Sequence, residues 1–227
     1  LHERSIPFMF LTNNSSKNKS EYQRKLISLG VKPDQALVFT SGDATASYLS
    51  KDSLVSKVYV VGTQGLIDTF ISQGLTITDE DPDVVVLGFD TSLTYAKICK
   101  LCEFIVRDKP FIATHFDINC PTPSGFIPDV GSMLAMIKAS TGREPDLVIG
   151  KPNRVIVDMI ASELNLKIED CAMVGDRLYT DIAMGATSGI KTVLVLTGET
   201  SREDLIDSIY KPDFIVQDLN ELREQIR

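Results

Sequence analysis

The chain has 227 residues, of which 43% are hydrophobic, and its 23 basic and 31 acidic side chains give a net charge of −8. A chain of this length buries about 70% of its unfolded surface, enough for one or two hydrophobic cores. The acidic balance, without any basic cluster, excludes nucleic acid and anionic membranes as expected partners. No apolar run approaches the roughly 20 residues that cross a bilayer, and the first residues show no signal-peptide pattern, so we expect a cytoplasmic protein.

Short apolar runs rich in β-branched residues alternate with segments of helical periodicity along the chain. Several of these runs are uninterrupted, as in parallel strands that are covered on both faces. The order predicts an α/β protein with a doubly wound parallel sheet. Strands are expected at 8–11, 58–61, 84–87, 111–113, 147–149, 172–174, 192–196 and 214–216, and helices at 19–29, 43–50, 64–73, 94–107, 130–140, 153–164, 180–187 and 201–208.

The first polar motif directly follows the strand expected at 8–11. Thr12, Asn13 and Asn14 supply hydroxyl and amide groups that can donate hydrogen bonds to a phosphate. Taken alone, the same residues also suit an ordinary cap of the helix expected at 19–29, because such side chains are favoured at helix starts.

Two further motifs follow later strands. Lys151 comes after the strand at 147–149, and Asp176 and Asp181 come after the strand at 172–174. Singly, the lysine suits the surface and either acid suits the start of a helix. Carboxylates at the carboxyl end of a strand also suit a hard cation such as Mg²⁺. The three motifs together predict a metal-assisted phosphate site in which Thr12, Lys151 and Asp176 lie close together.

The spacing of the motifs predicts an inserted domain. About 140 residues separate Thr12 from Lys151, whereas 25 separate Lys151 from Asp176. One strand-to-strand step of a doubly wound sheet takes roughly 25–40 residues. We therefore expect a core domain made of residues 1–41 and 146–227, with a smaller α/β cap domain at residues 42–145.

These motifs resemble the haloacid dehalogenase superfamily of phosphohydrolases, and more narrowly its NagD-like and p-nitrophenylphosphatase-like branch. The resemblance implies a Rossmann-like core with a C2-type cap, Mg²⁺ as cofactor, and hydrolysis of phosphomonoesters through an aspartyl-phosphate intermediate. The residues that carry it are Thr12-Asn13-Asn14-Ser15, Ala113-Thr114-His115-Phe116-Asp117, Gly150-Lys151-Pro152, Gly175-Asp176 with Asp181, and Leu196-Thr197-Gly198.

The resemblance also assigns roles to these side chains. Thr12, Lys151 and Asp176 would be catalytic, and Thr12, Asn13, Asn14 and Lys151 would bind the phosphoryl group. Asp176 would bind Mg²⁺ directly, whereas Asp181 would orient a metal-bound water or hold Lys151.

One family motif, the D-x-D-G that carries the attacking aspartate, has no counterpart in the chain. We expect about 30 further residues, one strand-helix unit, upstream of Leu1, and we expect the 227 residues alone to be inactive. The opposing interpretation is a non-catalytic protein that binds phosphate or a phosphorylated ligand.

Substrate choice would come from the predicted cap. His115, Asp117 and Asn119 lie in the loop after the strand at 111–113 and are candidates for contact with the leaving group. A simple turn shaped by Asp117 and the prolines that follow it is the alternative. The resemblance implies a small phosphorylated substrate, such as a sugar phosphate or a nucleotide, and makes a homodimer a candidate assembly.

Overall fold

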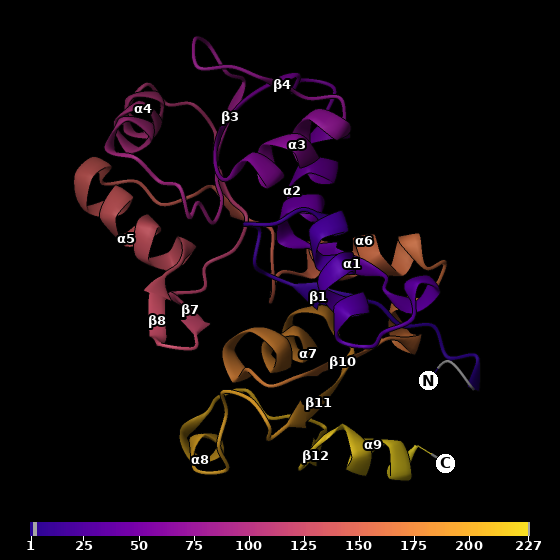
Figure 1. Ribbon diagram of the computed structural model, residues 1–227. Coiled ribbons are helices and arrows are strands. Elements are labelled where there is room, and N and C mark those ends of the chain that lie inside the picture. The colour runs from indigo at the N-terminus through magenta and orange to yellow at the C-terminus, as the bar shows by residue number, and fades with distance from the viewer. Residues whose placement is uncertain (2–3, 227) are drawn as a thin grey trace. The chain divides into compact units, whose positions relative to one another are not determined.

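A computed structural model describes residue 1 and residues 4–226, which form two compact units, Leu1–Gly150 and Lys151–Arg227. Both units combine helices with parallel sheets, which confirms the predicted fold class (Figure 1). The predicted division into residues 1–41 with 146–227 and an inserted 42–145 stays a prediction. Of the helices in the described part of the chain, none is both long and apolar enough to cross a bilayer.

The first unit is built around a parallel sheet of five strands in the order β4-β3-β5-β6-β9. A separate parallel pair, β1-β2, and an antiparallel hairpin, β7-β8, complete its strands. The elements are β1 (Phe10–Thr12), α1 (Lys19–Ser28), β2 (Val38–Thr40), α2 (Ser41–Ser50), β3 (Lys57–Val61), α3 (Gln64–Ser72), β4 (Thr76–Ile77), β5 (Val84–Leu87), α4 (Tyr95–Val106), β6 (Phe111–Ala113), β7 (Asn119–Thr122), β8 (Gly125–Pro128), α5 (Val130–Thr141) and β9 (Leu147–Val148), with a 3₁₀ turn at Pro33–Gln35.

The hydrophobic core of this unit lies between the five-stranded sheet and helices α4 and α5. Leu101, Phe104 and Ile137 from the two helices pack against strand residues such as Leu87 and Phe111. Figure 1 shows α4 and α5 on one side of β3 and α2 and α3 on the other. Every residue of β5 and β6 is buried, as the uninterrupted apolar runs predict. Each such large side chain contributes roughly 1.5–3 kcal/mol to stability through burial.

Capping residues set where two helices of this unit begin. The Asn18 side chain accepts a hydrogen bond from the Glu21 N–H while the Glu21 carboxylate accepts from the Asn18 N–H, so α1 begins at residue 19. Thr40 and Asp43 form the same reciprocal pair at the start of α2. Because Thr40 is the cap, α2 begins at Ser41, two residues before the predicted start.

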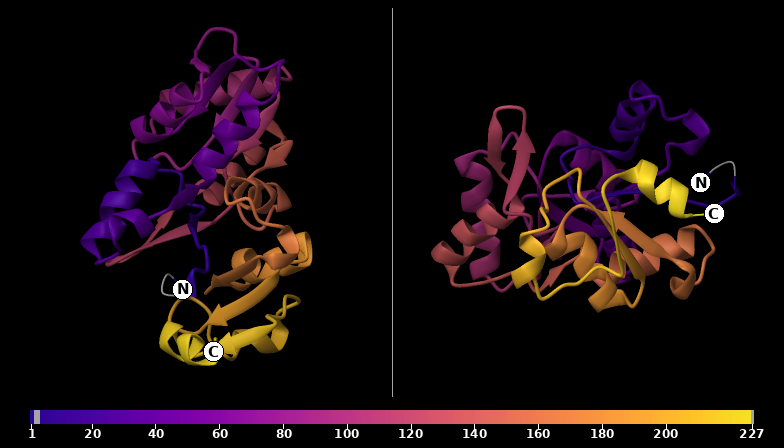
Figure 2. Two further views of the ribbon diagram at one scale, coloured as in Figure 1. Left: turned by 90° about the vertical axis from the view of Figure 1, so that its right-hand side faces the viewer. Right: turned by 90° about the horizontal axis from the view of Figure 1, so that it is seen from below.

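The second unit contains a parallel sheet of three strands in the order β10-β11-β12 (Figure 2). Its edge strand β10 is covered less fully than predicted, since 40% of Val174 is exposed. The elements are α6 (Arg154–Glu163), a 3₁₀ turn at Ile168–Asp170, β10 (Ala172–Gly175), a π-helical turn at Leu178–Ile182, α7 (Ala183–Ser188), β11 (Lys191–Val195), α8 (Asp204–Asp207), β12 (Phe214–Val216) and α9 (Leu219–Gln225).

Some expected elements have other bounds, and five of the helices and strands in the described part of the chain were not predicted. The strand expected at 8–11 is β1 at Phe10–Thr12, so Thr12 is its last residue. Proline disfavours strands, and the β7-β8 hairpin contains Pro121 and Pro128. The other unpredicted elements are β2, β4 and α9, of three, two and seven residues.

Candidate active site

Asp181 holds the predicted site residues of the second unit together. Its Oδ1 accepts a hydrogen bond from Lys151 Nζ at 2.7 Å, and its Oδ2 accepts from the backbone N–H groups of Asp176 and Arg177, both at 3.1 Å. The Lys151 and Asp181 side chains are 11% and 4% exposed, so each charge is compensated inside the protein. Lys151 and the turn that bears Asp176 are thereby fixed on one carboxylate.

Gly175 makes this arrangement possible at the end of β10. A Cβ atom at this position would lie 2.3 Å from both Cγ and Oδ2 of Asp181, far inside van der Waals contact. Only a residue without a side chain therefore lets the Asp181 carboxylate reach the N–H groups that follow the strand.

The Asp176 carboxylate is half-buried and oriented by the chain after β11. Its Oδ2 accepts a hydrogen bond from the Glu199 N–H at 2.8 Å, and its backbone carbonyl accepts from the Thr200 N–H at 3.2 Å. A Cβ at position 198 would lie 2.0 Å from Oδ2, so this close approach requires Gly198. Within the described residues of this unit no donor reaches the other oxygen, Oδ1. A hard cation such as Mg²⁺ fits an oriented carboxylate oxygen of this kind, with waters as its other ligands.

In the first unit, β1 ends at Thr12 and leads into the β1 loop, residues 12–15. Thr12 Oγ1 accepts a hydrogen bond from the Asn14 N–H at 3.2 Å, and Asn14 Oδ1 accepts from the N–H and hydroxyl of Ser16 at 3.0 and 2.7 Å. The alternative interpretation of this loop as the cap of the first helix is wrong, because Asn18 is the cap of α1.

Tyr22 of α1 supports the β1 loop. Its hydroxyl donates a hydrogen bond to the Asn14 carbonyl at 3.2 Å and also contacts the Thr12 side chain. Burial, together with the nearby Cys120, raises the pKa of Tyr22 well above its usual value of 10. The hydroxyl therefore stays protonated and remains a donor at physiological pH.

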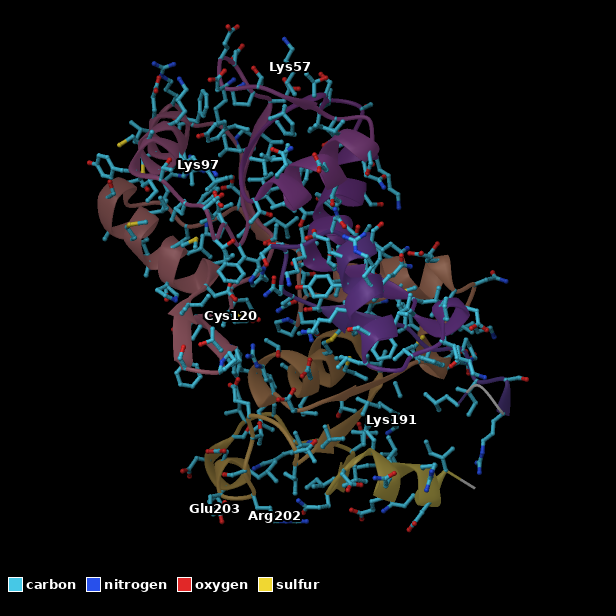
Figure 3. The ribbon with its side chains drawn as sticks, viewed as in Figure 1. Lys57, Lys97, Cys120, Lys191, Arg202 and Glu203 are labelled. Carbon is cyan, nitrogen blue, oxygen red and sulfur yellow. The ribbon has the colours of Figure 1, made fainter. Side chains whose placement is uncertain are left out.

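The predicted specificity residues divide into interior and surface. His115 and Asp117 are buried, with 0% and 5% of their surfaces exposed, whereas Asn119 in β7 is exposed. Asp117 Oδ1 accepts a hydrogen bond from Asn13 Nδ2 at 3.1 Å, which links this loop to the β1 loop. Cys120 (Figure 3) lies beside the β1 loop, with its Sγ 3.7 Å from Asn14 Nδ2.

Asp129 was not singled out in the sequence, although an acid directly before a helix of twelve residues is a visible capping signal. It caps α5 and accepts a hydrogen bond from His115 Nε2 at 2.9 Å. One potential ligand atom from each of His115, Asp117 and Asp129 lies within 4.8 Å of the other two, which could suit a metal ion. This cluster belongs to the first unit, whereas Asp176 and Asp181 belong to the second.

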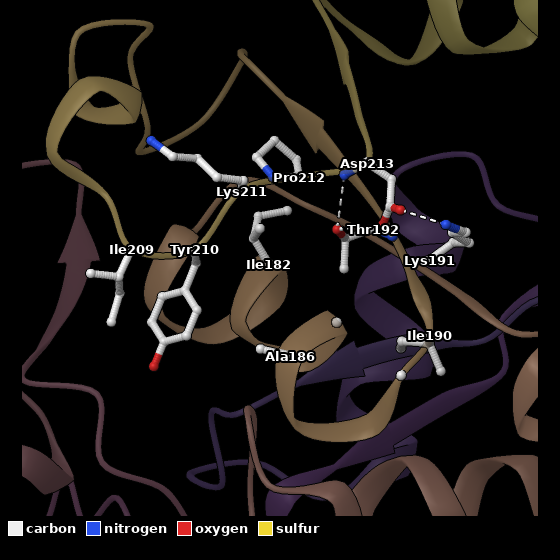
Figure 4. A pocket seen from close by; sticks show the side chains of 12 residues that line it. Ile182, Ala186, Ile190, Lys191, Thr192, Ile209, Tyr210, Lys211, Pro212 and Asp213 are labelled. Atoms are coloured by element: carbon white, nitrogen blue, oxygen red, sulfur yellow. Dashed lines mark hydrogen bonds and ion pairs between the residues drawn. The ribbon is translucent and has the colours of Figure 1, made fainter.

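A hollow of about 360 Å³ lies elsewhere in the second unit, between α7 and the segment before β12 (Figure 4). It is lined by Ile182, Tyr210 and Lys191, whose ammonium group is paired with Asp213 at 2.7 Å. None of the predicted site residues lines it.

The structure thus brings the predicted residues together in two sets. Lys151, Asp176 and Asp181 form one set in the second unit. The β1 loop forms the other in the first unit, with His115 and Asp117. The convergence of Thr12 with Lys151 and Asp176 stays a prediction.

Two family models match the chain. A haloacid dehalogenase-like hydrolase model matches residues 1–76, and a HAD-hydrolase-like model matches residues 148–222. The chain is 37% identical to the 5'-nucleotidase YutF of Bacillus subtilis over 97% of this chain and 86% of that protein.

Solved structures agree with these matches. The 4-nitrophenylphosphatase of Thermotoga maritima is 46% identical, with a TM-score of 0.94 over 100% of this chain and 87% of that one. A glycerol phosphate phosphatase of Mycobacterium tuberculosis, solved in complex with magnesium, is 29% identical, with a TM-score of 0.86 over 94% of this chain and 67% of that one. The family resemblance found in the sequence is confirmed: the chain belongs to the haloacid dehalogenase-like hydrolases and is one of their phosphatases.

Proposed function

We propose that this phosphatase hydrolyses small phosphorylated metabolites, such as sugar phosphates or nucleotides, and uses Mg²⁺ bound by Asp176. The observation that carries the proposal is the Asp181 carboxylate, which binds the Lys151 ammonium and the backbone of Asp176 at once. One carboxylate thus holds a cation and a metal-binding acid together. This arrangement suits a phosphoryl group, which gathers negative charge during its transfer.

The names of the relatives support the class of substrate. They describe a 5'-nucleotidase, a 4-nitrophenylphosphatase and a glycerol phosphate phosphatase, which all act on phosphomonoesters. Support for magnesium comes from the complex of the last of these and from the Asp176 oxygen that receives no hydrogen bond within its unit. When bound there, Mg²⁺ would neutralise charge on the phosphoryl oxygens.

Each residue has a proposed task. Lys151 would bind a phosphoryl oxygen, and Asp181 would keep its ammonium group in place. Thr12 would donate a hydroxyl hydrogen bond, and Asn13 and Asn14 would contribute donors of the β1 loop. As the family resemblance implies, an aspartate would attack phosphorus and release the alcohol, and water would then cleave the aspartyl-phosphate to yield phosphate.

The test is the turnover of p-nitrophenyl phosphate by the protein at its natural length, with Mg²⁺ and with EDTA. We expect release of nitrophenol that EDTA abolishes and added Mg²⁺ restores. Asp176→Ala should lose both activity and its response to Mg²⁺, and Lys151→Ala should weaken binding of inorganic phosphate measured by calorimetry.

Asp158→Ala is the matched control, because it removes a partly exposed acid of the same unit that pairs with Arg154 on α6. It should keep wild-type turnover. Phosphate binding without any turnover would refute the proposed enzyme activity and favour a non-catalytic phosphate-binding protein. Full turnover in EDTA would refute the assignment of Mg²⁺ to Asp176.

A further inference from the structure

The β1 loop is held by four buried hydrogen bonds from other parts of the first unit. The Ser41 hydroxyl donates to the Asn13 carbonyl, and Asn13 Nδ2 donates to Asp117 at 3.1 Å. Ser15 Oγ lies 3.0 Å from Thr114 Oγ1 and accepts from the Phe89 N–H at 2.9 Å. We call the four residues that make these bonds the anchors of the loop: Ser41, Asp117, Thr114 and Phe89. The direction of the loop's backbone depends on them.

The His115 ring touches two of the four anchors. Its Nδ1 lies 2.9 Å from Thr114 Oγ1 and 3.3 Å from Ser41 Oγ. The Asn13 carbonyl oxygen can only accept, so the Ser41 hydroxyl gives its single hydrogen to Asn13. A ring that donates from Nε2 accepts at Nδ1, so the Thr114 hydroxyl donates to His115, and Ser41 Oγ is in contact with the ring without a hydrogen bond to it. On the opposite side of the ring, Nε2 lies 2.9 Å from Asp129 Oδ1, which also accepts from the Val130 N–H at 2.7 Å.

We propose that His115 is a positioning residue, which connects the cap of α5 to the anchors of the β1 loop and so holds the loop's donors in the orientation that binds phosphate. This inference rests on the proposed function. The ring is 0% exposed, so it acts through its neighbours and does not touch substrate. The direct contact with the leaving group expected from the sequence is replaced by an indirect role.

The hydrogen-bonding capacity of the ring explains why histidine suits this position. Its two nitrogens lie on opposite sides of a rigid ring, so one side chain reaches both the Ser41–Thr114 pair and Asp129. Each of these polar atoms already has a partner, so the cluster with Asp117 is satisfied by hydrogen bonds. A bound metal at His115, Asp117 and Asp129 is the competing explanation, and the experiment separates the two.

The first measurement compares three variants in p-nitrophenyl phosphate turnover. Asp129→Ala removes the acceptor for Nε2, and we expect kcat to fall about ten- to hundredfold, because small displacements of binding groups have effects of this size. Asp129→Asn keeps an oxygen that accepts from His115 and from the Val130 N–H, so it should restore kcat to within about threefold of wild type.

Thr94→Ala is the matched control, because Thr94 caps α4 in the same unit and has no part in these hydrogen bonds. It should cost similar thermal stability but leave kcat within about twofold. An equal loss of kcat in Thr94→Ala and Asp129→Ala would show that Asp129 acts only by capping a helix. No recovery in Asp129→Asn would show that turnover does not depend on the hydrogen bond to His115. Either result would overturn the inference.

The second measurement is NMR of the histidine rings, which is simple because the chain has only two histidines. We expect a slowly exchanging ring N–H signal from His115 that shifts when inorganic phosphate is added. It should keep this response in Asp129→Asn and lose it in Asp129→Ala. This readout also works if the protein binds phosphate without turnover, so failure of the proposed enzyme activity is distinguishable from failure of this inference.

Two results would refute the positioning role. One is a His115 signal that ignores saturating phosphate in the wild type. The other is stoichiometric divalent metal in the purified protein that Asp129→Ala releases, since that would assign the cluster to a metal site.

Discussion

Replacing Asp181 by alanine should destabilise the second unit strongly. The substitution leaves the Lys151 ammonium, 11% exposed, without the carboxylate that lies 2.7 Å away. Removing one partner of a buried ion pair costs about 3–5 kcal/mol, because the remaining charge is poorly solvated. The N–H groups of Asp176 and Arg177 also lose their acceptor, but both residues are half-buried and water can replace part of that bonding.

This loss is large beside a typical stability of about 5–15 kcal/mol. For a chain of this size each kcal/mol lowers the melting temperature by about 2–4 °C, so we expect a decrease of roughly 6–20 °C. Urea unfolding followed by circular dichroism measures the free energy, and thermal melts measure the temperature shift. The Lys151→Met, Asp181→Leu double variant should recover part of the stability, because it removes both buried charges, but none of the activity.

Asp158→Ala is again the control, since it breaks an ion pair with Arg154 whose side chains are 58% and 47% exposed. Exposed pairs contribute less than about 1 kcal/mol. If Asp181→Ala unfolds within about 1 kcal/mol of Asp158→Ala, the Lys151–Asp181 pair does not stabilise the unit as we argue.

Three further predictions concern residues around the two sets. Gly175→Ala should destabilise by about 1–3 kcal/mol because its Cβ overlaps Asp181, and urea unfolding should show a much smaller cost in an Asp181→Ala background. Tyr22→Phe should cost about 0.5–1.5 kcal/mol by leaving the Asn14 carbonyl without its donor; an unchanged urea midpoint would contradict this. The hydrogen bond from Lys191 lowers the pKa of Asp213, so its contribution is present at neutral pH and lost as the pH falls below about 3.8. Melting temperatures of wild type and Asp213→Asn should therefore differ at pH 7 and converge in acid.

The sequence predicted well those features that depend on neighbouring residues. The apolar runs at Val84–Leu87 and Phe111–Ala113 are buried strands because their composition suits a sheet covered on both faces. The alternation of strands and helices was sufficient for the fold class, and the motif residues were sufficient for the family. Asp181 was expected to orient a metal-bound water or to hold Lys151, and the structure shows the contact with Lys151 and which oxygen makes it.

Features that depend on distant residues could not be predicted in this way. His115 was expected to face the substrate, yet its position in the interior depends on Ser41 and Asp129, which lie 74 and 14 residues away. β2 has only three residues and leads directly into α2, so it has neither the length nor the flanking turn that usually marks a strand.

The π-helical turn at Leu178–Ile182 limits how the number of residues between Asp176 and Asp181 can change in evolution. Its N–H groups at residues 182 and 183 bond to carbonyls five positions back, at Arg177 and Leu178, so the turn holds one residue more than an α-helical turn would. Deleting one residue between Asp176 and Asp181 would restore α-helical winding and rotate the acid by about 100° about the helix axis, away from Lys151. A shortened motif would then need a second substitution to supply a new counterion, which makes single-residue deletions here harder to tolerate than most point substitutions.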